Sequence, residues 1–377
     1  TYDRELDDIF AIQDEISNEI ANALRLTLAL DSGASGNLTG TNSLESYEHY
    51  LRGMSLWHER TAESLTAAIE EFEQAQQIDP NFAKAYGGLA LVWTVYDGYV
   101  AGDFNEMTNQ AERAADRALS LDPENVEAIT AKASVASVEL DYETAKTLFE
   151  RAIELNPSFA TAYQWYARLS GYQGDRDREI ELLEKARELD PRAPIISYNL
   201  AWSYWVAGEK ERAIDLIEET LDKVPDFPDG LSTLLMFNLI EGDCQEVERV
   251  ARRIVSELEK TEDKSSVYVG LCEADDGAER GRLMDEILGW GNFDFPNPED
   301  PSLTYDLEFI MVPIAYGDYE RGLRMLEVLA KNWAPQNLDW YRHTTNDNMA
   351  EFNCLDSVQA VYADLELPAS GYESTCP

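Results

Sequence analysis

A proline recurs every 34 residues through the middle of the chain. It closes the segments LDP, LNP, LDP and VP, at Pro123, Pro157, Pro191 and Pro225. An earlier copy, IDP, ends at Pro80, one period plus nine residues before Pro123. A fixed period of this length is typical of stacked helical hairpins, and it constrains the fold more than any other feature of the sequence.

Small residues and turns repeat with the same period. Alanine flanks a larger apolar residue at spacings of three and four, as in Ala68–Phe72–Ala75 and Ala145–Phe149–Ala152. Such spacings share one helix face, where alanine permits close packing. The turn within each hairpin is followed by an acidic residue, and it begins at Leu140, Gly174, Gly208, Gly242 and Gly317. Glycine favours a helix C-terminus and the acid can cap the next helix, so each period predicts a helix–turn–helix hairpin.

Departures from the period predict the irregular parts. The nine extra residues fall near Asp97–Met107 and are expected to lengthen a hairpin tip. Further on, we expect a degenerate helix pair over Lys264–Glu273 and Ala278–Leu288, a loop over Gly291–Pro301, and a closing helix over Asn348–Leu365. The expected boundaries are 1–30 for an N-terminal linker or docking helix, 31–43 for a flexible linker, 44–259 for the regular array, 260–301 for the degenerate repeat and loop, 302–335 for a further hairpin, and 336–377 for a capping helix and tail.

The segment Tyr2–Leu30 is itself amphipathic. Its apolar residues recur at helical spacing, as Ile9, Ile12, Ile16, Ile20 and Leu24. We expect a helix that packs on something, most simply on the first repeat. Ser32–Asn37 (SGASGN) is a small-residue linker between this helix and the array.

The whole pattern resembles the tetratricopeptide repeat. The matching first-helix residues are Tyr86, Leu89, Ala90, Tyr163, Ala167, Leu200 and Ala201, besides the alanines and prolines above. The resemblance implies an all-α fold, a right-handed superhelical solenoid of helix–turn–helix hairpins with terminal capping helices. The opening YDRELDDIFAIQDEIS and the stretch Tyr47–Ala90 are similar to the linker helix and first repeat of bacterial multidomain signalling proteins. In these, a cyclase, winged-helix or kinase domain and a TolB-like domain precede the repeats.

Charge and cysteine content limit the possible functions. There are 73 Asp and Glu residues against 30 Lys and Arg, giving a formal net charge of −43. Such a surface repels phosphate backbones and anionic membranes, so we expect no nucleic-acid partner. No apolar run is long enough to span a bilayer. The four cysteines permit two disulfides, and sequence proximity suggests Cys244–Cys272 and Cys354–Cys376; buried free thiols are the alternative.

The sequence contains no recognisable catalytic motif. Phosphate-binding loops, nucleophile elbows and zinc-binding helices are all missing, and no acidic run matches a calcium loop. The three histidines, His49, His58 and His343, are not spaced as a metal pair, so we expect no metal, no cofactor and no enzymatic activity. Asn37-Leu38-Thr39 matches a glycosylation triplet, which matters only if the chain is secreted.

One constellation favours binding. Aligning the repeats places Gln164, Arg168 and Tyr172 on the concave side of the array, followed by Tyr198, Trp202 and Trp205 in the next repeat. Aromatic and arginine side chains dominate binding hot spots, although the two tryptophans would equally serve to fill gaps between hairpins.

We therefore expect a non-catalytic scaffold that binds a peptide or a partner protein in its groove. One alternative is an extracytoplasmic structural protein that self-assembles head to tail into a homo-oligomer or filament. Another is the sensory or regulatory region of a signalling protein. The cysteines favour the periplasm or cell surface, with the cytoplasm as the alternative.

Overall fold

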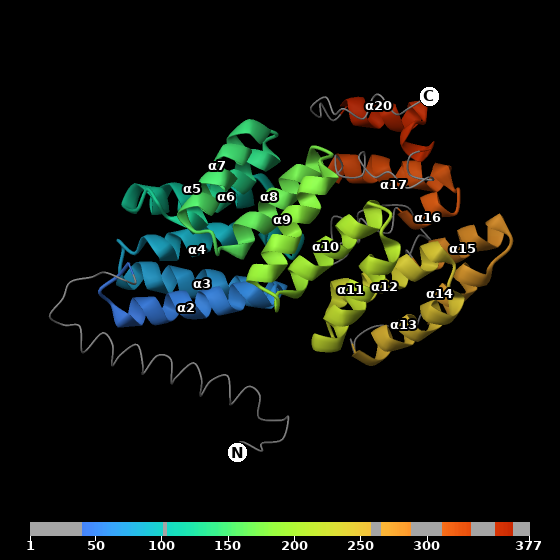
Figure 1. Cartoon of the computed structure of the whole chain (residues 1–377), viewed down its shortest axis with the longest axis horizontal. Coiled ribbons are helices and arrows are strands. Elements are labelled where there is room, and N and C mark those ends of the chain that lie inside the picture. Colours follow the sequence, from blue (N-terminus) through green and yellow to red (C-terminus); the bar gives the residue numbers. More distant parts are fainter. Residues whose placement is uncertain (1–39, 101–103, 258–264, 288–310, 333–350, 365–377) are drawn as a thin grey trace, which may run out of the picture. The chain divides into compact units, whose positions relative to one another are not determined.

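All the regular elements that the structure describes are helices. It is a computed structural model, and it describes residues 40–100, 104–257, 265–287, 311–332 and 351–364. The expected opening helix, the linker with its Asn37-Leu38-Thr39 triplet, the loop 291–301, His343 and Cys376 lie outside these ranges. The all-α expectation for the array is confirmed, because every regular element in these ranges is a helix and most helices pack on a neighbour along the chain (Figure 1).

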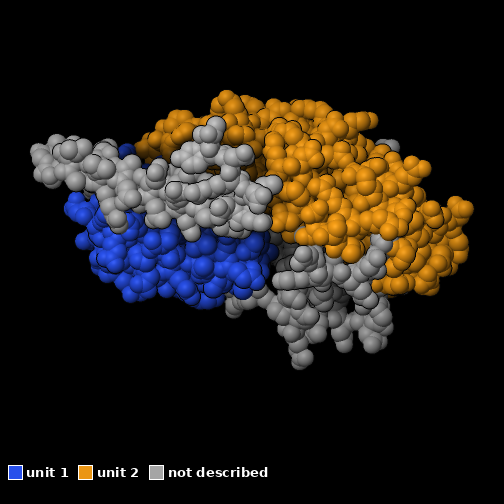
Figure 2. Space-filling model, turned by 90° about the horizontal axis from the view of Figure 1, so that it is seen from below, with its two compact units in different colours: residues 1–131 blue, residues 132–377 orange. Residues whose placement is uncertain are grey.

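The chain forms two compact units, residues 1–131 and 132–377, which are coloured separately in Figure 2. The described helices of the first unit are α2 (Leu44–Glu59), α3 (Ala62–Ile78), α4 (Ala83–Trp93), the 3-10 turn η2 (Tyr96–Gly98) and α5 (Phe104–Leu121). The division falls inside α6 (Val126–Val138). The first unit pairs α2 with α3 and α4 with α5. Its nine extra residues fall where η2 precedes α5, in agreement with the expected hairpin tip.

The second unit continues through the helices α7 to α15, which have nine to fourteen residues each, and ends its described part with α16, α17 and α20. Their bounds are α7 (Tyr142–Leu155), α8 (Ala160–Tyr172), α9 (Arg176–Leu189), α10 (Pro194–Val206), α11 (Lys210–Lys223), α12 (Pro228–Glu241), α13 (Cys244–Glu257), α14 (Ser265–Glu273), α15 (Gly277–Ile287), α16 (Met311–Ala315), α17 (Tyr319–Asn332) and α20 (Asp356–Asp364). Each helix from α7 to α14 packs against the next. The degenerate pair expected over 264–288 is present as α14 and α15, and α20 lies within the expected closing helix.

The repeated alanines and large apolar residues form the core. Ala68, Phe72 and Ala75 are fully buried on α3, and Ala145 and Ala152 are fully buried on α7. Phe72 lies against two glycines, because a Cβ atom at Gly53 or Gly88 would approach its ring to 2.8 or 2.5 Å. Only glycine permits this approach, which lets α2 and α4 close on the ring from two sides.

The hairpin turns follow one backbone geometry. Gly174, Gly208, Gly242 and Gly317 have φ between 73 and 82°, and Leu140 takes the same left-handed conformation at 63°. The following Asp141, Asp175, Asp243 and Asp318 each accept a hydrogen bond from the backbone amide three residues on, at 3.1–3.2 Å. Glu209 occupies the cap position in the remaining copy and makes no such bond. The turn prediction is thus confirmed, with Leu140 and Glu209 as two imperfect copies.

Candidate interaction surface

The six residues predicted to line a groove have unequal exposure. Gln164, Tyr172 and Trp202 are each 5% exposed and Trp205 is 1% exposed, whereas Arg168 and Tyr198 are half-buried. Four of the six therefore lie in the protein interior. Their assignment as partner contacts stays a prediction, and the accessible part of the predicted groove is reduced to Arg168 on α8 and Tyr198 on α10.

The tryptophans fill the seam between α10 and α12. The ring of Trp205 stacks on Phe237 of α12 with centroids 3.9 Å apart and planes 3° from parallel. Trp202 meets the same ring edge-on at 4.9 Å, and its indole Nε1 donates to Thr233 Oγ1 at 3.2 Å. Stacked and edge-on ring pairs with a satisfied indole are typical of core packing. These contacts match the alternative interpretation of the sequence, in which the two tryptophans fill gaps between hairpins.

Arg168 and Tyr198 retain partial access. Arg168 Nη2 donates to Ser134 Oγ at 3.1 Å, and its guanidinium lies 6.0 Å from the centre of the Trp165 ring. The Tyr198 ring lies 6.3 Å from Phe227 in an edge-on arrangement. Both contacts leave part of each side chain facing solvent, which gives α8 and α10 one cationic and one aromatic group at the surface.

Most of the described cations are paired within the chain. Between neighbouring hairpins, Arg187 contacts Glu219 at 2.8 Å, Arg249 contacts Glu218 at 2.6 Å and Lys210 contacts Glu241 at 2.5 Å. Single exposed pairs contribute little stability. Their effect on binding is larger than their effect on stability. Because these cations are neutralised by the chain's own carboxylates, the excess of acidic residues dominates the surface potential.

Two sets of Glu, Tyr and Arg occur in successive hairpins. Tyr166 donates to Glu150 at 3.1 Å beneath Arg178. In the next set Tyr204 donates to Glu184 at 2.7 Å, with Arg212 only 3.9 Å above its ring. Burial raises the pKa of each tyrosine to about 12, and the hydrogen bond to glutamate acts in the same direction. Each set ties three consecutive helices together, so it fixes the register between hairpins.

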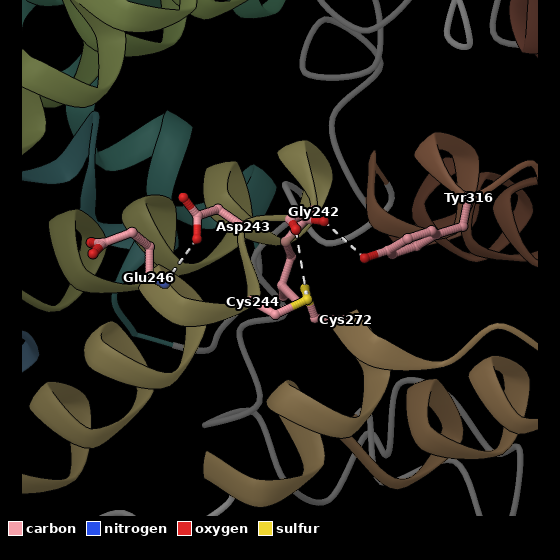
Figure 3. The surroundings of a disulfide bond; sticks show 7 residues. Gly242, Asp243, Cys244, Glu246, Cys272 and Tyr316 are labelled. Atoms are coloured by element: carbon pink, nitrogen blue, oxygen red, sulfur yellow. Dashed lines mark hydrogen bonds between the residues drawn. A yellow bond between two sulfur atoms is a disulfide. The ribbon is translucent and has the colours of Figure 1, made fainter.

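A disulfide joins Cys244, the first residue of α13, to Cys272 on α14 (Figure 3). Their Cα atoms are 5.5 Å apart, within the usual range for such a bond. This is one of the two pairs that sequence proximity suggested. Cys354 is also disulfide-bonded. Because Cys376 lies outside the described residues, the second predicted pair stays a prediction.

Sequence reasoning missed a second contact at the end of α12. The Tyr316 hydroxyl donates to the Leu239 carbonyl at 2.8 Å, which brings the end of α16 onto α12 (Figure 3). The Arg280 guanidinium lies 4.8 Å from the centre of the Tyr316 ring. Burial raises the pKa of the Tyr316 hydroxyl, while Arg280 acts in the opposite direction. No spacing rule connects residues so far apart in sequence, so no local signal pointed to this contact.

The histidines that the structure describes have ordinary surroundings. His49 Nδ1 lies 2.7 Å from Glu71 Oε2, which also accepts from Arg52 Nε at 2.9 Å. His58 lies exposed near the end of α2. Within the described ranges, no group of histidine, cysteine and carboxylate side chains is arranged to hold a metal ion, and no helix there is long and apolar enough to cross a membrane.

Comparison with known proteins agrees with this architecture. A tetratricopeptide-repeat family model matches residues 167–228. The "Putative adenylate cyclase 3" of Rhizobium meliloti (strain 1021) is 33% identical over 91 residues, which are 24% of this chain and 16% of that protein. The chain therefore spans only about a sixth of this curated relative. Among solved structures, a monomeric mutant of IFIT1 with Gppp-AAAA aligns over 88% of this chain and 76% of its own, at 14% identity and a TM-score of 0.52.

A second structure, yeast Tom70, aligns over 96% of this chain and 75% of its own, at 13% identity and a TM-score of 0.45. The 34-residue period, the hairpin turns and the family match agree with one another. The chain contains tetratricopeptide-type repeats, matched by the family model over residues 167–228.

Proposed function

We propose that this protein is a non-catalytic scaffold that binds a basic peptide or a basic face of a partner protein. The supporting observation is the charge distribution on the array. The chain carries 43 excess negative charges, while cations such as Arg187, Lys210 and Arg249 are paired with its own glutamates. Complementary charge steers encounter and suppresses acidic competitors.

The half-exposed Tyr198 supplies apolar contact area within this surface, and Arg168 supplies hydrogen-bond donors for peptide carbonyl groups. Aromatic residues gain much contact area for little loss of conformational freedom, so Tyr198 is the better candidate for an energetic anchor. The buried Trp202 and Trp205 act indirectly in this proposal, by holding α10 against α12.

Fluorescence anisotropy with synthetic peptides of equal length and basic, neutral or acidic composition tests the proposal. Basic peptides are expected to bind most tightly, with affinity that falls as salt is added. Tyr198→Ala is expected to weaken binding by roughly tenfold, the effect of a moderate hot spot. Thr147→Ala, an uncharged change at an exposed position on α7, is the control. Equal affinity for all three compositions, or an equal loss in both variants, would refute the proposal.

A second candidate function is a regulatory repeat region within a longer signalling protein. The 33% identity to the adenylate cyclase named above favours it. Because the chain covers so little of that relative, cyclase activity is not part of this proposal. Co-expression with the cyclase domain of that relative, followed by a cyclic-nucleotide assay, tests whether the repeats alter its output. An unchanged output at saturating repeat protein contradicts it.

An oxidising location, the periplasm or cell surface, is proposed on the grounds of the cysteines, since disulfides persist outside reducing compartments. The alternative function, head-to-tail assembly into a homo-oligomer or filament, is proposed for the same oxidising location. Thiol labelling and mass spectrometry of protein from its native source test the location, and electron microscopy of that material tests for filaments. Four free thiols would count against the oxidising location.

A further inference from the structure

The lengthened tip of the second hairpin carries aromatic side chains. Trp93, the last residue of α4, and Tyr96, the first residue of η2, lie edge-on with their ring centroids 5.0 Å apart, and both are half-buried. We call these two rings the tip pair. In the second unit, three hairpin tips expose small or polar residues, namely Gln173 and Gly174, Ala207 and Gly208, and Glu241 and Gly242. The second hairpin therefore has partly accessible rings where these three tips have none.

Contacts within the first unit hold the tip pair in place. The Tyr96 hydroxyl lies 2.9 Å from Thr66 Oγ1 on α3. The Val100 backbone amide donates to the Tyr96 carbonyl at 2.9 Å, which closes the turn. A Cβ atom at Gly98 would meet no other group within 4 Å, so space is open beside this turn. A ring surface that is fixed before binding loses little conformational freedom when a partner arrives.

Other rings of the first unit are covered by a cation of the chain itself. The Arg117 guanidinium lies 5.5 Å from the centre of the Tyr86 ring, on the same helix as Trp93. Arg60, at the turn before α3, lies 4.2 Å from the centre of the Trp57 ring. Among the residues that the structure describes, no lysine or arginine lies over either ring of the tip pair. The tip pair thus lacks the cation that these other rings carry.

Carboxylates border the tip pair. Glu63 and Glu70 are exposed and lie three residues before and four residues after Thr66, on the same face of α3. Because Thr66 contacts the Tyr96 hydroxyl, this face of α3 adjoins the tip. Asp97 is exposed within η2 and supplies a third carboxylate. Aromatic faces attract a cation through the ring quadrupole, and neighbouring negative charges act in the same direction.

We propose that the tip pair binds an arginine or lysine side chain of a basic partner protein. The partner's cation takes the place over the tip pair that Arg117 takes over Tyr86, with the three carboxylates at its border. This inference rests on the proposed preference for basic partners and adds a second site to it. The tip pair lies in the first compact unit, whereas Tyr198 and Arg168 belong to the second, so the two sites can be tested separately.

Fluorescence anisotropy with a labelled arginine-rich peptide tests this site. A peptide with citrulline in place of arginine keeps the planar end group without its charge and is expected to bind the parent protein more weakly. The double variant Trp93→Leu, Tyr96→Leu is expected to weaken binding of the arginine peptide by roughly tenfold. Tyr86→Leu is the matched control, because it removes a ring from the same helix whose face already holds Arg117. It is expected to leave the affinity unchanged.

A pair of surface variants tests the site without altering its rings. Glu63 and Glu45 are each the second residue of their helix, and both are exposed. Glu63→Gln and Glu45→Gln therefore remove the same charge from equivalent positions, at the tip and at the opposite end of the first hairpin. Glu63→Gln is expected to weaken binding of the arginine peptide by about threefold, and Glu45→Gln by clearly less.

Hydrogen–deuterium exchange locates the bound peptide, which is expected to slow exchange in residues 93–100. Protection of α3 without peptide reports whether each variant is folded. The proposal is overturned if residues 93–100 exchange equally fast with and without peptide, or if Glu63→Gln and Glu45→Gln have equal effects. If Tyr198→Ala weakens binding and the folded tip variants do not, the tip site alone fails. If the arginine and citrulline peptides bind the parent protein equally, the preference for basic partners fails with it.

Discussion

Helix α12 receives two neighbours that are held in very different ways. On one side α10 packs against it through Trp202 and Trp205, which contact Phe237 in the following hairpin. On the other, α16 reaches it from 77 residues away through the Tyr316 hydroxyl. A disulfide joins α13 to α14, two of the helices that lie between α12 and α16 in the sequence. The contact between α10 and α12 is made by apolar side chains within the regular repeats. The contact between α16 and α12 is made by individual residues beyond the part of the chain that keeps the 34-residue period.

The difference between these two contacts shows how the regular repeat contributes to packing between hairpins. Where the 34-residue period is intact, hairpins pack on one another through apolar side chains, and the Glu–Tyr–Arg sets add polar contacts that recur from hairpin to hairpin. Where the helices shorten, as in α14 and α16, less apolar surface is available, and a covalent bond and a hydroxyl–carbonyl contact are added. The first two changes below each weaken one of these regions, and the last two alter a turn of the regular repeat.

Trp205→Ala is expected to cause the largest effect. It removes a side chain that is 1% exposed and stacked on Phe237, and such truncations cost about 3–5 kcal/mol. Hydrogen exchange of α10 and α12 measures the loss locally, which avoids assuming that the whole array unfolds in one step. Tyr198→Ala on the same helix, at a half-exposed position, is the control and should cost much less. Equal costs would mean that the tryptophan is not central to this seam.

Cys272→Ser is expected to have the next largest effect. The bond joins residues 28 apart, and loops of that size give a disulfide contribution of about 3 kcal/mol. The loss should appear as faster exchange in α14 and α15, with α10 unchanged. Reducing the parent protein with dithiothreitol also opens the bond of Cys354, so it should cause at least the same loss in α14 and α15. A loss spread evenly over all the hairpins would show that the two regions are coupled.

Leu140→Gly is expected to stabilise the protein. A residue with a Cβ atom loses roughly 1–2 kcal/mol in the left-handed conformation, and the other four copies of this turn use glycine. Part of that gain is offset, because glycine is more flexible in the unfolded chain. Gly208→Leu is the reverse change at a site where an added Cβ atom would meet no other group within 4 Å, so its cost is conformational. Thermal unfolding of both variants should shift in opposite directions.

Asp141→Ser is expected to change the pH dependence of stability slightly. The hydrogen bonds from the Thr144 side chain and backbone amide lower the pKa of this carboxyl. Its stabilising contribution is therefore full above the unfolded-state pKa and disappears as pH falls through the lower folded-state value. Serine keeps a cap without titrating. Urea unfolding at neutral and acidic pH should show a smaller acid-induced loss in the variant, and an identical loss would exclude this contribution.

Much of the fold follows from the sequence, because helical hairpins make mainly local contacts. The proline period located the hairpins, and the turn glycines located their tips, where Gly174 and Gly208 share the left-handed backbone conformation. Repeat position placed Trp205 either in the groove or in a gap between hairpins, and it could not decide between the two. It did not indicate that Phe237 covers the Trp205 ring, because the covering residue depends on the identity of the next repeat. The Tyr316 contact joins residues 77 apart in the sequence, which a 34-residue period does not predict.

The Glu–Tyr–Arg sets have a consequence for how such an array can change its length. Glu150 and Glu184 are 34 residues apart, and so are Arg178 and Arg212. Removing residues 178–211 would bring Arg212 to the chain position that Arg178 now holds, over the same Tyr166. A whole hairpin can thus be lost without leaving the Tyr166 hydroxyl or Glu150 unmatched, although the two tyrosines are 38 residues apart and the sets are not exact copies.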